Sequence, residues 1–206
     1  MLVSEAVSIL QRSELKQLAV KDDPDSILGF INLGVLEIYK KFSLWDAEAI
    51  IIMEEGKRKY TLDGSDGDVQ IDLSDHDLLV IEEAYDKDGE LLSINDEKDI
   101  EGVMTPKFNQ VEIAHPVDGE VISIVYRASP KFMTVNTQAI QLPNQFLEAL
   151  FLFVGYKAQL SVKAGMQDNN NTYYARFVAA CNLIKEQGLY IRDNLNSSKF
   201  VDRGFA

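Results

Sequence analysis

Apolar side chains recur at helical spacing in the first part of the chain. This spacing predicts one helix over residues 3–20 and a second, with a wider apolar stripe, over Ile27–Phe42. The segment KDDPDS between them is a break, in which Pro24 suits a helix start and Asp25 or Ser26 is placed to cap the second helix. The positions that carry the first pattern are Val3, Ala6, Val7, Leu10, Leu15 and Leu18.

The pattern then changes to the two-residue period of strands. The run AEAIIIMEE followed by KRKYTL predicts two strands joined at Glu55-Gly56, and DGSDGD is a cluster of turn residues. The run LLVIEEAYDKDGELLSI predicts a hairpin with Asp88-Gly89 as its turn. Further strands are predicted at 69–73, 111–113 and 121–126. The middle of the chain, residues 46–135, is therefore predicted to be a β-rich module.

Helical spacing returns after Leu142-Pro143-Asn144, where Pro143 suits the first turn of a helix. The apolar residues of this third helix surround it more widely than packing on one side requires. An Asn-rich break follows, and a last helix is predicted from about Thr172 to near Gly188. Short loops between long helices favour antiparallel neighbours. The predicted fold is therefore α+β: an antiparallel bundle of two N-terminal and two C-terminal helices with a β-rich module inserted.

These patterns divide the chain into four parts. Residues 1–45 and 136–188 are predicted to form the bundle, 46–135 the inserted acidic module, and 189–206 a C-terminal segment. That last segment has no periodicity but carries aromatic and apolar residues. Two interpretations are open: a frayed terminus, or an arm whose aromatic side chains anchor on another subunit.

The charge of the chain is concentrated in its middle. The 206 residues carry a formal net charge of −13, and positions 46–105 hold 19 Asp or Glu against 5 Lys or Arg. An acidic surface repels nucleic acid, because phosphate binding needs clustered Lys and Arg. The apolar run ALFLFVGY lies between Glu148 and Lys157, so it is far shorter than the roughly 20 apolar residues that a membrane-spanning helix needs. It is predicted to be a buried helix, with no membrane partner.

Candidate chemical groups are few. The carboxylates of DGSDGD could hold a hard cation, but their order does not match an EF-hand, and tight turns need the same residues. In SDHD, His76 is predicted to lie in a solvated loop, and the single Cys181 on the apolar face of the last helix. No phosphate loop, zinc spacing or nucleophile elbow is present. The sequence therefore predicts no catalytic residue, metal site or cofactor.

Several longer stretches resemble one protein family. The stretches IQLPNQFLEALFLFVGYKAQLS and NNNTYYARFVAACNLIKEQGL resemble the C-terminal helices of the head-to-tail adaptors of short-tailed bacteriophages, of the type called tail tubular protein A. In that family a Leu-Pro pair starts a helix, an Asn-rich break follows, and a helix with paired tyrosines closes the domain. RKYTLDG, IEEAYDKDGELL and VYRASP resemble its inserted β region, and DDPDSILGFINLGVLEIYKKF its second helix.

The resemblance implies a structural protein of the virion, assembled in the host cytoplasm. It would form a ring, usually of twelve copies, beneath the portal protein, contact the tail tube or nozzle proteins, and let DNA pass without sequence-specific binding. Because Phe146, Phe151 and Phe153 point around their helix, we expect them to serve a subunit interface as well as the bundle core. The alternative is that the bundle and the β module cover them without a neighbour.

The C-terminal segment would then be a docking arm. Its expected contact residues are Phe200, Val201, Arg203 and Phe205. Two other functions stay open at this point. One is a cation-binding module that uses the carboxylate-rich middle of the chain, and the other is a different tail component, such as a completion or terminator protein.

Overall fold

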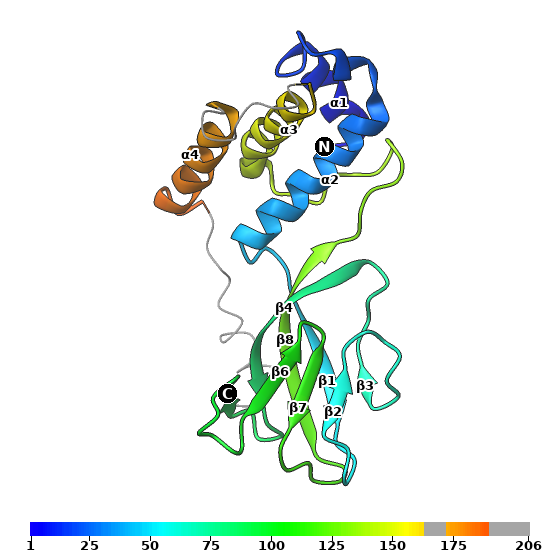
Figure 1. Cartoon of the computed structure of the whole chain (residues 1–206), viewed down its shortest axis with the longest axis vertical. Coiled ribbons are helices and arrows are strands. Elements are labelled where there is room, and N and C mark those ends of the chain that lie inside the picture. Colours follow the sequence, from blue (N-terminus) through cyan, green and yellow to red (C-terminus); the bar gives the residue numbers. More distant parts are fainter. Residues whose placement is uncertain (163–171, 190–206) are drawn as a thin grey trace, which may run out of the picture. The chain divides into compact units, whose positions relative to one another are not determined.

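The chain folds into a helical unit and a strand-rich unit. The computed structural model describes residues 1–162 and 172–189 (Figure 1). The helical unit combines Met1–Ile38 with the described residues from Met133 onward, and the strand-rich unit is Tyr39–Phe132. The α+β class predicted from the sequence is confirmed.

Four α-helices and two short 3-10 helices occur within the described residues. Their bounds are α1 Val3–Arg12, η1 Ala19–Asp22, α2 Pro24–Lys41, η2 Asn144–Phe146, α3 Leu147–Val162 and α4 Thr172–Glu186.

The prediction of one helix over residues 3–20 is wrong, because α1 ends at Arg12. Ser13 leaves the helical conformation. Its hydroxyl donates to the carbonyl oxygen of Ile9 at 2.8 Å and so supplies a hydrogen bond to the last turn of the helix. Leu15 is nevertheless fully buried. The apolar pattern therefore predicted the burial of Leu15 correctly but the length of the helix incorrectly.

The cap of α2 also differs from the predicted candidates, because it lies two positions before Asp25. Asp23 caps this helix: its carboxylate accepts the Ser26 amide at 3.1 Å and the Ser26 hydroxyl at 2.6 Å. The hydroxyl and amide bonds from Ser26 hold the pKa of Asp23 below its ordinary value. Pro24 follows as the first helical residue, as its missing N–H allows.

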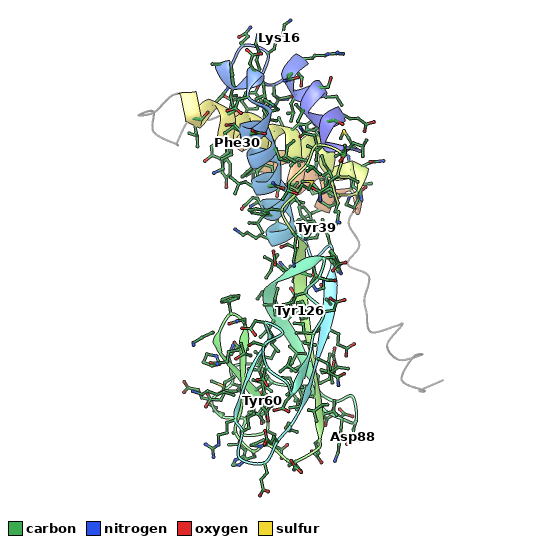
Figure 2. The ribbon with its side chains drawn as sticks, turned by 90° about the vertical axis from the view of Figure 1, so that its right-hand side faces the viewer. Lys16, Phe30, Tyr39, Tyr60, Asp88 and Tyr126 are labelled. Carbon is green, nitrogen blue, oxygen red and sulfur yellow. The ribbon has the colours of Figure 1, made fainter. Side chains whose placement is uncertain are left out.

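The strand-rich unit contains two antiparallel sheets. One has five strands in the order β3-β1-β8-β4-β5, and the other has three in the order β2-β7-β6. The bounds are β1 Asp46–Ile52, β2 Lys59–Thr61, β3 Val69–Gln70, β4 His76–Tyr85, β5 Leu91–Leu92, β6 Val103–Lys107, β7 Gln110–Ile113 and β8 Val121–Pro130. Both sheets contribute to one core, in which Tyr60 and Tyr126 are the largest fully buried side chains (Figure 2).

The strand predictions are partly confirmed. The hairpin is present as β4 and β5, and Gly89 adopts the positive φ of 82° that its turn requires. The runs on either side of Glu55-Gly56 do form strands, but β1 and β2 belong to different sheets. The strand predicted over 69–73 ends at Gln70, and β6 was not predicted.

In the helical unit, α3 packs closely against other elements of its own chain. A Cβ built on Gly34 of α2 would lie 2.6 Å from Leu150 Cδ1, and one built on Gly155 of α3 would lie 2.8 Å from the Tyr173 ring of α4. The two glycines therefore let α2 and α4 approach α3 more closely than larger residues would. This packing on more than one side explains the wide apolar surface of α3.

Candidate functional site: docking surfaces of the helical unit

The three aromatic residues expected at a subunit interface differ in their burial. Phe146 is fully buried and Phe153 retains 5% exposure, whereas Phe151 is half-buried. Phe153 packs edge-on against Phe177 of α4, with ring centroids 5.2 Å apart. The helical unit itself therefore covers Phe146 and Phe153, and of the three only Phe151 retains substantial surface for a neighbour.

An open groove of about 700 Å³ lies between the start of α3 and the outer flank of α4. The two helix ends meet here, because the Gln145 side-chain amide donates to the Leu189 carbonyl oxygen at 3.2 Å. The apolar lining includes Leu152, Ala179 and Leu183, and Leu183 keeps 49% of its surface exposed. Small residues in the lining of a groove allow another backbone to approach closely, and apolar grooves of this kind can accept a helix.

The charges that line this groove are separated along its length. Arg176 lies in the first half of α4, where its guanidinium is 5.8 Å from the centre of the Tyr173 ring. Glu148, at the start of α3, and Glu186, at the end of α4, lie at the opposite end. The groove therefore has a basic end and an acidic end.

The expected docking arm cannot be placed. Phe200, Val201, Arg203 and Phe205 lie outside the described residues.

In the strand-rich unit, the DGSDGD loop is organised around a lysine. Lys57 Nζ lies 2.5 Å from Asp66 Oδ1 and 2.6 Å from Asp68 Oδ2. Burial alone would raise the pKa of Asp66, but hydrogen bonds from Lys57 and from the Thr61 and Asp68 amides hold it below its ordinary value. The ammonium group thus stands where a cation bound by these two carboxylates would have to stand.

His76 does not lie in a solvated loop, so that expectation is wrong. It begins β4 and is only 6% exposed. Its Nδ1 lies 2.7 Å from Asp75 Oδ1 and its Nε2 lies 2.8 Å from the Tyr126 hydroxyl, and its ring packs on Trp45. Burial, together with the charges of Asp72 and Asp75, raises the pKa of Tyr126 to about 12. Tyr126 is 50 residues away in the sequence, so no local pattern around SDHD could have predicted this network.

The described residues offer neither a metal-binding cluster nor a membrane-spanning helix. Residues 1–162 and 172–189 contain no group of three or more His, Cys, Asp or Glu side chains arranged to hold a metal ion. Over the same residues no helix has the length and apolar character needed to cross a membrane.

These features define a two-unit α+β protein with an open groove between α3 and α4 and with networks of ion pairs and hydrogen bonds in its strand-rich unit. The chain belongs to the SU10 adaptor protein family, which it matches over residues 2–197. A search of curated proteins gave no match. Membership confirms the resemblance to phage head-to-tail adaptors and makes the chain a phage adaptor protein, a structural component that interacts with other head and tail components.

Proposed function

We propose that this protein is a head-to-tail adaptor of the virion. It forms a ring beneath the portal, connects the capsid to the tail, and lets DNA pass through its centre. The family match over nearly the whole chain is the observation that carries this proposal. The adaptor interacts with the portal on one side and with tail tube or nozzle proteins on the other. Twelve copies are the expected number.

The distribution of charge supports a passage to which DNA does not adhere. Tyr39–Phe132 holds 22 Asp or Glu against 10 Lys or Arg, which gives this unit a net charge of −12. Helical and strand-rich units thus differ strongly in charge, and neither has the excess of Lys and Arg that phosphate binding needs.

Subunit contacts in the proposed ring use the helical unit. Phe151 is the member of the aromatic set that keeps accessible surface, and the α3–α4 groove exposes Leu183. Exposed apolar surface of this kind is typical of protein–protein contacts. Phe146 and Phe153 act from inside the chain by holding α3 in place.

Co-expression with the portal protein of the same phage, followed by native mass spectrometry, tests the proposal. We expect a complex that contains several copies of this chain per portal ring. Binding to tail proteins with no portal complex would instead assign the chain to a completion or terminator role. The cation-binding alternative has no comparable support, because Lys57 occupies the carboxylates that such a module would use.

A further inference from the structure

A second exposed helix surface is the outward stripe of α2. At helical spacing it contains Asp25, Gly29, Leu33 and Lys40, all of them exposed. Leu33 keeps 41% of its surface exposed, and a Cβ built on Gly29 would meet no atom within 4 Å. The stripe therefore has an acidic start, an apolar centre and Lys40 at its end, where the half-buried Glu37 lies on its flank.

The groove between α3 and α4 has the opposite order along α4. Arg176 comes first, Leu183 follows, and Glu186 and Glu148 mark the end. The helical rise places Asp25 about 12 Å from Leu33 along α2, and Arg176 about 10 Å from Leu183 along α4. The order of charged and apolar positions therefore matches on the two surfaces, and the acidic-to-apolar spacing of α2 matches the basic-to-apolar spacing of α4. At the other end Lys40 lies about 10 Å beyond Leu33 and Glu186 about 5 Å beyond Leu183, a difference that the long Lys40 side chain has to bridge.

We propose that the α2 stripe of one copy docks in the α3–α4 groove of the next copy, with α2 running in the same direction as α4. Asp25 then faces Arg176, Leu33 packs on Leu183 and the neighbouring alanines of the groove, and the Lys40 side chain reaches back toward the acidic end of the groove. This inference rests on the proposed ring and assigns its subunit contact.

The contact joins two different surfaces, so it is heterologous. Each copy offers one stripe and one groove, and therefore every copy can bind a neighbour on both sides. Such head-to-tail contacts form a ring when the rotation between copies closes. A two-fold dimer could use both surfaces only by seating each stripe in the partner's groove, and it would then not grow beyond two copies.

Charge reversal tests the pairing on the full-length chain. We expect Arg176→Asp and Asp25→Arg each to weaken self-association by about tenfold or more, because like charges then face each other at the contact. The double variant restores association, since the pair is re-formed with its signs exchanged. An equimolar mixture of the two single variants also associates, because each variant keeps the surface that complements the other. Sedimentation velocity measures all four samples.

Matched charge changes on the strand-rich unit are the controls. Lys98→Asp and Glu97→Arg make the same changes at exposed positions and should leave association unchanged. If wild-type chains associate but the single variants do so equally well, or the double variant does not recover, the inference is overturned while the adaptor function stands. If wild-type chains associate neither alone nor on the portal, the proposed ring is overturned as well.

Cysteine cross-linking detects the same contact even when it is weak. A mixture of Leu33→Cys and Leu183→Cys chains should form disulfide-linked dimers on oxidation, whereas Ile9→Cys with Leu183→Cys should not. The natural Cys181 is buried, so it need not be replaced in these variants. If the Leu183→Cys thiol is instead protected from labelling in dilute monomer, and removal of residues 190–206 exposes it, the chain's own C-terminal segment fills the groove and the inference is overturned.

Discussion

Asn32 is a buried polar side chain on the inner side of α2. Its amide nitrogen donates to the Met133 carbonyl oxygen at 2.9 Å, and its amide oxygen accepts the Met133 N–H at 2.9 Å. The side chain therefore satisfies both backbone groups of a residue 101 positions later, where the chain returns to the helical unit.

Replacing Asn32 should destabilise the helical unit because the Met133 backbone groups lose their partner. We expect Asn32→Ala to lower the free energy of unfolding by about 2–3 kcal/mol. Denaturant unfolding followed by helical circular dichroism measures the change. Asn136→Ala, at an exposed position, is the control. Equal stability of the two variants would show that Asn32 is not an important tether.

Asp66 makes the stability of the strand-rich unit depend on pH. Its pKa is lowered in the folded state, so its contribution is present above the unfolded value of 3.8 and is lost as the pH falls through the folded value. Asp66→Asn should cost about 1–2 kcal/mol at neutral pH, because the ion pair with Lys57 is lost. The variant and the wild type should converge in acid, once the pH has fallen below the lowered pKa of Asp66 in the folded state.

Fluorescence of Trp45, the single tryptophan, follows unfolding of this unit. Asp77→Asn, at an exposed site, is the matched control. A constant difference between the Asp66→Asn variant and the wild type across this pH range would contradict the assignment.

At the scale of elements, two glycines on α2 have opposite roles. Gly34 faces α3, where a Cβ would lie 2.6 Å from Leu150 Cδ1 and 3.2 Å from Phe153 Cδ1. Leu150 is fully buried and cannot easily move. Gly34→Ala should therefore destabilise the chain by about 1–3 kcal/mol. Gly29→Ala has free space and should stabilise it by up to about 1 kcal/mol through helix propensity. Thermal unfolding that moves both variants in the same direction would contradict this packing.

Local periodicity predicted the elements better than their partners. The α2, α3 and α4 helices follow from apolar spacing, because packed helix faces leave a helical period in the sequence. The strand β6 contains Met104, Thr105 and Pro106 without alternation, so it gave no signal. That β1 pairs with β8 depends on contacts between residues some 75 positions apart in the sequence, such as Ser123 and Glu48, which no local window contains.

The site was less predictable than the fold for the same reason. The breadth of the apolar surface of α3 was visible, but whether its aromatic residues face a neighbour or the chain's own core depends on where α2 and α4 pack. Gly34 and Gly155 decide that packing, and a single sequence does not show that they do. The groove likewise forms from η2, α3 and α4 together.

At the scale of the whole molecule, the charge distribution predicts how the protein behaves toward DNA. The net charge of −13 repels the phosphate backbone, and the strand-rich unit carries most of it. We expect no retardation of duplex DNA in a gel-shift assay, even at a salt concentration of about 50 mM, where electrostatic binding is strong. Retention that weakens steeply with added salt would contradict a passage to which DNA does not adhere.

The C-terminal segment supplies the last prediction. Phe200, Val201 and Phe205 are the large apolar residues of the stretch 196–206, and aromatic anchors often dominate protein–protein binding. Truncation after Asn194 should weaken docking to the portal by about tenfold or more, while the unfolding of both units stays unchanged. In the full-length chain, Phe200→Ala with Phe205→Ala should reproduce the loss, and Ser197→Ala with Ser198→Ala should not. The serine control changes the segment without removing an anchor. If the phenylalanine variant and the truncation both keep the wild-type affinity for the portal, the segment is a frayed end. The portal contact would then have to come from the folded units.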